Sequence, residues 1–290
     1  MKICYFGSYN RDYPRNKILI NGLRKNNVNV TECNFDFPHI ITIKDSLSHE
    51  YDGIIVGFPG QKTVPFARLI SKLKGVNLVF DAFLSVYNTY VFDRKDVKQN
   101  SLKGRYYYSL DKISCKLADV VLLDTYQHIK YFLKTFNISQ NKFRRIFIGA
   151  EDNIFYPRKY KKDGDKFVVE FHGKFIPLQG TNYIIKAAKL LEKDKEIIFN
   201  LIGNGKTYEK TFRLAQKLKL KNVNFLGWIV YEKLPFFIAN ADVGLGIFGN
   251  TEKAKMVVPN KAYEILAMKK ALITGDSPAS REVGLINEKN

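Results

Sequence analysis

Short apolar runs alternate along the chain with longer stretches whose apolar residues recur every three or four positions. The short runs are typical of buried strands and the longer stretches of amphipathic helices. In the first half the predicted strands are Lys2–Gly7, Asn29–Phe35, Gly53–Gly57, Asn77–Asp81, Val120–Asp124 and Arg144–Gly149. The predicted helices between them are Asn16–Asn26, Pro65–Leu73, Ser101–Leu117 and Thr125–Phe136. Such alternation favours a parallel sheet that is covered on both faces.

The same alternation restarts after the polar segment Tyr156–Lys166, which has the composition of a linker. The second set of predicted strands is Phe167–Phe171, Ile197–Ile202, Val223–Leu226, Val243–Phe248 and Ala271–Thr274. The second set of predicted helices is Thr181–Glu192, Thr207–Leu218, Glu232–Ala239 and Asn260–Lys269. We therefore predict an α/β protein with two Rossmann-like, doubly wound domains that face a cleft, residues 1–155 and 167–290, joined by a linker at 156–166. Open α/β sheets bind ligands at the carboxyl ends of their strands.

The composition is that of a globular protein, with 46% hydrophobic and 26% charged residues among 290. No apolar run approaches the roughly 20 residues that a membrane-spanning helix needs. Met1 leads directly into the first predicted strand, so no secretory signal is expected. The three cysteines form no framework spacing, and their odd number suits a reducing compartment. These features favour a cytoplasmic location.

The formal net charge of +19 points to an anionic partner or simply to a lysine-rich proteome. A phosphorylated substrate, an anionic membrane surface and nucleic acid would all fit such a charge. The lysines are spread along the chain and no nucleic-acid-binding motif is present, which disfavours nucleic acid. The four histidines are scattered without the spacing of a helical zinc site, so no metal site is predicted.

Glycine-bearing turns follow several of the predicted strands. Glycine permits close backbone approach, and a helix start offers amides to an anion, although such turns also need glycine for geometry alone. None of the turns matches the dinucleotide-binding or Walker patterns. Three turns that carry lysine lie in the second half and favour a diphosphate site. The candidate residues in the glycine turns are Gly7, Gly173, Lys174, Gly203, Gly205 and Lys206.

The motifs "GKFIPLQGTNYIIKAAKLL", "LIGNGKTYE", "VNFLGWIVYEKLPFFIANADVGLGIF" and "VPNKAYEILAMKKALITGD" occur in that order in the second half. This half resembles the nucleotide-sugar domain of the retaining GT-B glycosyltransferases of family 4. The first half, with "DAFLSVYNTYVFDR", "LADVVLLDT" and "IGAEDNIFYP", is similar to the acceptor domain of that family. The resemblance implies transfer of a sugar, with retention, from a UDP or GDP sugar to a saccharide or lipid-linked saccharide. It implies no separate cofactor.

The resemblance also assigns roles to residues. It implies that Glu264 binds the ribose hydroxyls, as suits an acceptor-only carboxylate opposite a vicinal diol. Pro259, Asn260 and Lys261 at the start of that helix would contact the diphosphate. Lys174 matches a basic position that contacts the donor phosphates.

Other candidates are less specific. His172 is placed to contact the donor sugar or to line the site. Asp81 could orient the acceptor hydroxyl or act as a general base, but an Asp after a strand is equally often a helix cap. Arg11 and Arg15 could attract a phosphorylated or lipid-linked acceptor. The helix at 101–117 mixes tyrosines with basic residues, which core packing or contact with a membrane surface would both explain.

The sequence departs from the family pattern in several places, one of which is Lys270–Ala271 in place of a glycine–proline step after the helix. Gln179 replaces a second basic residue, for which Lys206 or Lys261 could compensate, and Met256 replaces the first of a pair of carboxylates. Family members continue well beyond Glu282, so the second domain is expected to be incomplete at its C-terminus. These departures leave open an alternative, a catalytically silent relative that binds a nucleotide or a partner without turnover.

Overall fold

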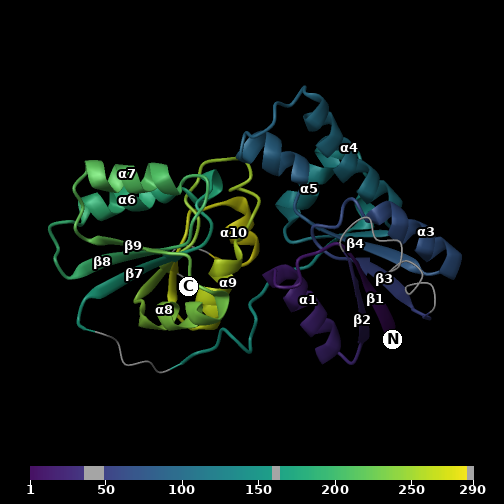
Figure 1. Cartoon of the computed structure of the whole chain (residues 1–290), viewed down its shortest axis with the longest axis horizontal. Coiled ribbons are helices and arrows are strands. Elements are labelled where there is room, and N and C mark those ends of the chain that lie inside the picture. The colour runs from purple at the N-terminus through teal and green to yellow at the C-terminus, as the bar shows by residue number, and fades with distance from the viewer. Residues whose placement is uncertain (36–48, 159–163, 286–290) are drawn as a thin grey trace. The chain divides into compact units, whose positions relative to one another are not determined.

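The computed structural model describes residues 1–35, 49–158 and 164–285, which form two compact units, Met1–Ile148 and Gly149–Asn290 (Figure 1). Within the described residues each unit is built around one parallel sheet. The predicted α/β class with two parallel sheets is confirmed. The units divide between Ile148 and Gly149, ahead of the linker expected at 156–166, and residues 159–163 of that linker lie outside the described part.

The sheet of the first unit has the strand order β2-β1-β3-β4-β5-β6 in the described residues. Its strands are β1 (Lys2–Gly7), β2 (Asn29–Asn34), β3 (Gly53–Val56), β4 (Asn77–Phe83), β5 (Val120–Leu123) and β6 (Phe143–Arg145). The α-helices of this unit are α1 (Pro14–Lys25), α3 (Val64–Lys74), α4 (Leu102–Leu117) and α5 (Tyr126–Phe136). Shorter helical turns are η1 (Asn88–Asp93), which is π-helical, and η2 (Gln140–Lys142).

Side chains alternate across this sheet, and both of its faces are apolar as a result. Cys4 and Phe6 of β1 belong to the main core, to which α3, α4 and α5 contribute. Tyr5, between them in sequence, belongs to a second cluster that contains Ile20 of α1. The continuous apolar run of β1 is therefore the mark of a strand that is covered on both sides.

The sheet of the second unit has the order β11-β10-β7-β8-β9 in the described residues. Its strands are β7 (Phe167–His172), β8 (Ile197–Ile202), β9 (Val223–Gly227), β10 (Val243–Leu245) and β11 (Ala271–Ile273). Its α-helices are α6 (Thr181–Leu190), α7 (Tyr208–Lys217), α8 (Leu234–Asn240), α9 (Asn260–Ala267) and α10 (Pro278–Glu282). Two 3-10 turns, η3 (Pro177–Gln179) and η4 (Tyr231–Lys233), precede α6 and α8. Helices α6 and α7 lie on one face of the sheet, and α8 and α9 lie on the other (Figure 1).

The two-residue period of β7 decides which of its side chains can meet α9. Val169 and Phe171 belong to the core that includes α6 and α7. Glu170 and His172 alternate with them and therefore point to the opposite face, which α8 and α9 cover. Two polar side chains of an otherwise apolar strand are in this way placed on the same side of the sheet as α9.

The strand order of the second sheet reverses between β7 and β10. From β7 the chain runs through β8 to β9 on one side, and then returns to build β10 and β11 on the other. The turns after β7 and β10 consequently leave the sheet in opposite directions, which opens a crevice at their carboxyl ends. The start of α9 follows β10, so the segment around Pro259 lies at this switch point of the fold.

Most predicted strands and helices are present with ends within about two residues of those expected. Two strands end earlier than predicted, β6 at Arg145 and β10 at Leu245. After Leu245 the chain leaves the sheet, and the amide of Phe248 donates to the carbonyl oxygen of Gln179 (3.0 Å). The π-helical turn η1 and the helix α10 were not predicted.

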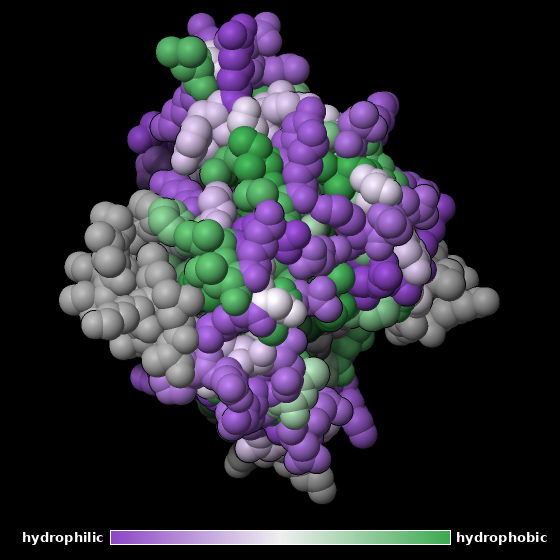
Figure 2. All heavy atoms as spheres, turned by 90° about the vertical axis from the view of Figure 1, so that its right-hand side faces the viewer, coloured by the Kyte–Doolittle hydropathy of each residue, from purple (hydrophilic) through white to green (hydrophobic). Residues whose placement is uncertain are grey.

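Helix α3 is apolar on both of its sides. Ala67 and Ile70 belong to the core, but Leu69 and Leu73 on the outer side have 59% and 68% of their surface exposed. Figure 2 shows hydrophobic side chains gathered among hydrophilic ones on the face of the molecule that carries α3. The outer side of α3 therefore exposes leucines on a helix that also carries Arg68, Lys72 and Lys74.

Candidate functional site

Three glycine-bearing turns meet at the carboxyl ends of β7, β8 and β10. A Cβ atom added to Gly203 would lie 2.0 Å from the carbonyl oxygen of Gly173, and one added to Gly249 would lie 2.4 Å from that of Leu178. The amide of Gly249 also donates to Leu178 (3.1 Å). The glycines allow backbone to pack directly on backbone, and the three turns form one connected surface.

Gly173, Gly203 and Gly205 were predicted to lie at the donor site, and in the structure their backbone amides have partners within the unit. The amide of Gly173 donates to the carbonyl oxygen of Ile202 (3.0 Å), and that of Gly203 donates to Gly227 (2.7 Å). The amide of Gly205 donates to the side chain of the residue before it (2.7 Å). Each amide therefore bonds within the unit, and these glycines serve the packing of the turns.

Gly7 lies in the first unit, at the end of β1. Its φ is +125°, and a Cβ atom there would lie 2.7 Å from the hydroxyl oxygen of Thr63. A side chain at this position would therefore require both a strained backbone and a displaced threonine. This explains the glycine without a ligand.

At the switch point of the second sheet, four side chains form a buried array. Nδ1 of His172 lies 3.0 and 3.1 Å from the two carboxylate oxygens of Glu170, its neighbour on β7. Nε2 of His172 lies 2.9 Å from Oε2 of Glu264, on α9. The hydroxyl of Tyr231 donates to the other oxygen, Oε1, of Glu264 (3.1 Å). Glu170, His172 and Glu264 are all at least 97% buried.

The array fixes the protonation of His172. A carboxylate can only accept hydrogen bonds, so a ring that lies between two carboxylates has a proton on both nitrogens. Burial alone would lower the pKa of His172, but Glu170 and Glu264 raise it to about 9. The pKa of Tyr231 is raised by burial and by Glu264, which keeps the phenol protonated as a donor. Glu264 thus has one donor on each oxygen.

Lys261 lies in the first turn of α9 and is also buried. Its ammonium is 3.6 Å from the centre of the Phe171 ring and donates to Oε1 of Gln179 (2.6 Å). Burial lowers the pKa of Lys261 to about 7, against the opposing effect of Glu170 and Glu264. The side chain that replaces the family's second basic residue, Gln179, is therefore in direct contact with a lysine from another element. This contact is consistent with the compensation considered above.

Further positive charge surrounds the start of α9. Pro259 is the cap residue of α9, with extended backbone angles, and Asn260 is its first helical residue. The amides of a first helical turn lie at the positive end of the helix dipole. Lys174 and Lys206 are exposed on the turns after β7 and β8. These groups could bind an anion at the carboxyl end of the sheet.

The structure gives Asp81 a partner that the sequence did not suggest. The guanidinium of Arg15 donates from Nε to Oδ2 (3.0 Å) and from Nη2 to Oδ1 (2.9 Å) of Asp81, and both side chains are fully buried. Nη1 of Arg15 donates to the carbonyl oxygens of Ile146 and Phe147 (3.0 and 3.1 Å). Asp81 is therefore a structural partner in this state, not an accessible base, and Arg15 is not available to an acceptor. Arg11, by contrast, is exposed and pairs with Glu32 (2.8 Å).

Two further acids of the first unit, Asp124 and Asp111, are buried and hydrogen-bonded. Asp124 lies 2.5 Å from Nδ1 of His128, one turn into α5. Asp111 of α4 accepts from the hydroxyl of Ser85 (2.7 Å) and the amide of Tyr87 (3.0 Å), and burial raises its pKa to about 6. Asp111 thereby fixes the loop after β4 to α4. In the second unit, Glu170 was not predicted as a site residue, although its two-residue spacing from His172 places both side chains on the same face of β7.

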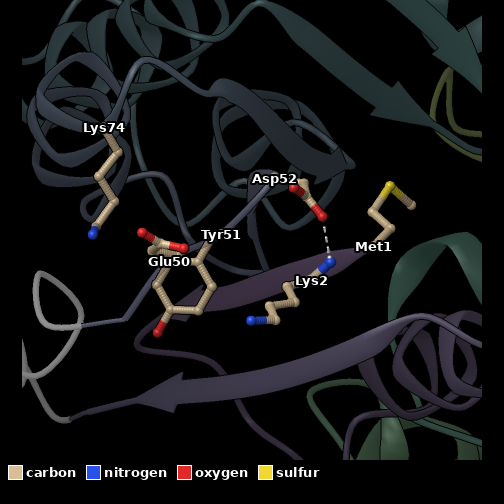
Figure 3. Close-up of a pocket in the computed structure, with 6 residues that line it drawn as sticks. All are labelled: Met1, Lys2, Glu50, Tyr51, Asp52 and Lys74. Carbon is tan, nitrogen blue, oxygen red and sulfur yellow. Dashed lines mark hydrogen bonds between the residues drawn. The ribbon is translucent and has the colours of Figure 1, made fainter.

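An open hollow of about 540 Å³ lies at the other end of the first sheet (Figure 3). Met1, Lys2, Glu50, Tyr51, Asp52 and Lys74 line it. Two of its charged side chains have local partners: Asp52 accepts from the backbone amide of Lys2 (2.6 Å), and Lys74 donates to the carbonyl oxygen of His49 (2.6 Å). Because it lies at the amino ends of β1 and β3, it is at the edge opposite to the one where such sheets bind ligands.

The sequence of the second unit is similar to the sequences of known glycosyltransferases. Residues 152–285 match the family model of the Glycosyl transferases group 1. The uncharacterized glycosyltransferase MJ1178 of Methanocaldococcus jannaschii is 28% identical over 208 residues, which are 67% of this chain and 51% of that protein. The Escherichia coli protein WcaI, provisionally described as a colanic acid biosynthesis glycosyl transferase, is 30% identical over 162 residues. That match covers 49% of this chain and 39% of WcaI, so the chain spans about half or less of these curated relatives.

The fold is shared with solved glycosyltransferases over nearly the whole chain. The Anabaena protein Alr3699/HepE, solved in complex with UDP-glucose, superposes with a TM-score of 0.67 at 14% identity and covers 98% of this chain and 82% of its own. A sucrose-phosphate synthase from Thermosynechococcus elongatus also gives a TM-score of 0.67 at 14% identity, with coverages of 99% and 84%. At this identity the likeness concerns the fold, which is that of the GT-B glycosyltransferases.

Among the described residues, no group of three or more His, Cys, Asp or Glu side chains is arranged to hold a metal ion. In the same part of the chain, no helix has the length and apolar character required to cross a bilayer.

Proposed function

We propose that this protein is a glycosyltransferase that moves a sugar from a nucleoside-diphosphate donor to a saccharide or lipid-linked saccharide, with retention at the anomeric carbon. The observation that carries the proposal is the placement of Glu264, His172 and Lys261 together at the switch point of the second sheet. This constellation lies inside the segment that matches the Glycosyl transferases group 1. In the proposal the nucleotide sugar is a substrate, and no cofactor takes part.

In the proposed reaction the bond between the anomeric carbon and the β-phosphate oxygen breaks, and a bond to the acceptor oxygen forms on the same face. The proton of the acceptor hydroxyl passes to the departing phosphate oxygen. Negative charge develops on that phosphate, and groups preorganised around it stabilise the transition state. We assign this role to Lys174, Lys261 and the first turn of α9, with Lys206 and the segment Pro259–Asn260 as further contacts.

Glu264 would bind the donor through its ribose. A carboxylate has about four lone-pair positions, and His172 and Tyr231 occupy two of them. The vicinal hydroxyls of a ribose are two donors and match the other two positions. Structures of HepE were obtained with UDP and with UDP-glucose, which favours a uridine donor for testing first.

The test is calorimetric titration with UDP-glucose and with a GDP sugar. The expected result is binding to the unmodified chain and a loss of roughly tenfold or more for Glu264→Ala, because a hydrogen bond to a charged group is worth about 1.5–3 kcal/mol. Glu252→Ala is the matched control, since the Glu252 side chain is 77% exposed on the same unit. Equal donor affinity in the Glu264 variant and in the control contradicts the proposal.

A second candidate is a nucleotide-binding relative without turnover. Asp81 is occupied by Arg15, and the position of the family's first carboxylate is held by the buried Met256. As a result, Asp81 is not available to act on the acceptor, and no carboxylate stands at the position that would act on the transferred sugar. Release of nucleoside diphosphate in the presence of saccharide acceptors distinguishes the two, because donor binding without release favours the silent protein.

The acceptor would meet the first unit, as the resemblance to the family's acceptor domain implies. A lipid-linked acceptor places the reaction at a membrane surface, and we propose a cytoplasmic protein that contacts the inner face of a membrane reversibly. The exposed Leu69 and Leu73 of α3 support this contact. Nucleic acid plays no part in the proposal.

A further inference from the structure

Glu170 is an acid in the middle of a sheet, and its burial has a cost. Only 1% of its surface is exposed, and it lies on β7, the central strand of its sheet. A buried carboxylate is strongly unfavourable unless another group compensates its charge. The hydrogen bonds of its carboxylate go to His172, with both oxygens near the same ring nitrogen.

His172 connects Glu170 to Glu264. Nδ1 of His172 is held by Glu170 of β7, and Nε2 is held by Glu264 of α9, 92 residues away in sequence. A ring held at both nitrogens cannot flip or rotate without losing a charge-assisted hydrogen bond. The position of the Glu264 carboxylate is therefore coupled to an acid that lies in the sheet beneath it.

We propose that Glu170 and His172 are positioning residues of the nucleotide-sugar site: Glu170 holds the His172 ring as an imidazolium, and the ring holds the Glu264 carboxylate in the orientation that receives the ribose. This inference rests on the proposed function for the role of Glu264. It adds two residues that act through Glu264, and it explains why β7 carries two polar side chains on one face.

The charges around the ring fit this arrangement. The titratable groups that face His172 or the carboxylates beside it are Glu170 of β7, Glu264 and Lys261 of α9, and Tyr231 of η4. An imidazolium between two carboxylates leaves one net negative charge, which Lys261 balances when it is protonated, below its pKa of about 7. Neutral histidine would leave the two acids with less compensation, so the array favours the protonated ring.

The first measurement needs no ligand. In the whole chain with 15N-labelled histidine, the ring of His172 is expected to keep both protons well above neutral pH and to titrate at about 9. Glu170→Gln is expected to bring the titration back toward the ordinary value of 6.5, because the amide brings no negative charge. The signal is assigned by its loss in His172→Gln. A wild-type ring that titrates near 6.5 overturns the inference.

The second measurement links the ring to the donor. Glu170→Gln is expected to weaken the binding of UDP-glucose about tenfold at pH 7.5, with unchanged thermal stability as the sign of a folded protein. Glu209→Gln, whose side chain is 64% exposed on α7, is the matched control and is expected to bind as the wild type does. Unchanged affinity in Glu170→Gln overturns the positioning role, even if the ring titration has shifted.

The two proposals fail in different ways. If UDP-glucose and GDP sugars bind to neither the wild type nor the variants, the proposed function fails, whereas the titration of His172 still reports on the array. If the wild type binds the donor and Glu264→Ala does not, but Glu170→Gln and His172→Gln bind as the wild type does, only the positioning role fails. If Glu170→Gln does not fold, the wild-type titration and the affinity of His172→Gln decide the matter.

Discussion

Lys261 shows how one residue can link the packing of the second unit to its proposed ligand. Three N–H donors belong to its ammonium, and the described contacts account for one of them, to Gln179. A Cβ atom on Gly173 would lie 3.1 Å from Nζ, so the ammonium lies directly beside the backbone of the turn after β7. A diphosphate that approaches from the turn after β7 would therefore find an enclosed cation that still has donors to offer.

The pKa of Lys261 predicts a proton uptake on donor binding. Burial lowers this pKa to about 7, so at pH 8 the amine of the free protein is mostly neutral. An adjacent diphosphate favours the charged form and raises the pKa again. Binding of UDP-glucose at pH 8 should therefore take up close to one proton, and affinity should weaken as the pH rises above 7.

Calorimetry in two buffers of different ionisation enthalpy measures this uptake. Lys261→Arg should abolish it, because a guanidinium keeps its charge throughout this pH range. Lys174→Arg is the matched control, since Lys174 is exposed on the neighbouring turn, and it should keep the uptake. The absence of proton uptake in the wild type would show that Lys261 does not meet the phosphates.

At the scale of elements, the turns after β7, β8 and β10 pack against one another through their backbones. Their glycines were interpreted as donor-binding residues, and in the structure Gly203 and Gly205 lie against the turn after β7, whereas Gly173 lies against the side chain of Lys261. The same residue type suits both purposes, because what glycine offers is room for another group beside the backbone. Which group fills that room depends on the tertiary arrangement and cannot be read from one turn.

A pair of glycine substitutions tests this account. In Gly203→Ala the new methyl group would lie 2.0 Å from a backbone oxygen at a φ of +125°, and we expect a loss of about 3 kcal/mol in the free energy of unfolding. Gly227→Ala also has a positive φ, +69°, but its methyl group would meet no described atom within 4 Å, and the expected loss is about 1 kcal/mol. Urea unfolding of the two variants measures the difference, and equal losses would mean that backbone strain alone accounts for the glycines.

The elements themselves could be predicted well from the sequence, whereas their contacts could not. Strands such as β1 and β8 are apolar runs between polar segments. A parallel sheet that is covered on both faces needs apolar side chains along each of its strands, so such runs predict it. The pairing of Arg15 with Asp81 spans 66 residues, and that of His172 with Glu264 spans 92. Each pairing depends on which strands are neighbours, and hydrophobic periodicity does not contain that information. The family resemblance supplied Glu264 and Lys261, but not the partners that hold them.

At the scale of the whole molecule, part of the large positive charge lies on the neighbouring helices α3 and α4. Helices α3 and α4 carry one acid, Asp111, which is buried, and the following basic residues: Arg68, Lys72, Lys74, Lys103, Arg105, Lys112 and Lys116. Leu69 and Leu73 are exposed among these charges. Core packing explains the inner faces of both helices, as expected, but it does not explain leucines on the outer side of α3. Basic residues around exposed aliphatic ones are typical of a surface that binds anionic lipid.

Vesicle sedimentation tests this surface directly. Each leucine that enters a bilayer contributes up to about 1.5–3 kcal/mol, and each nearby basic residue contributes about 1 kcal/mol, which suffices for reversible binding. We expect the protein to sediment with vesicles that contain phosphatidylglycerol, far less with pure phosphatidylcholine, and to be released at high salt. The double variant Leu69→Ser, Leu73→Ser should lose roughly tenfold or more in affinity, whereas Leu190→Ser, at a site in the second unit with 85% of its surface exposed, should bind as the wild type does. Equal binding to neutral and anionic vesicles, or a double variant that sediments as the control does, would mean that this face serves another purpose.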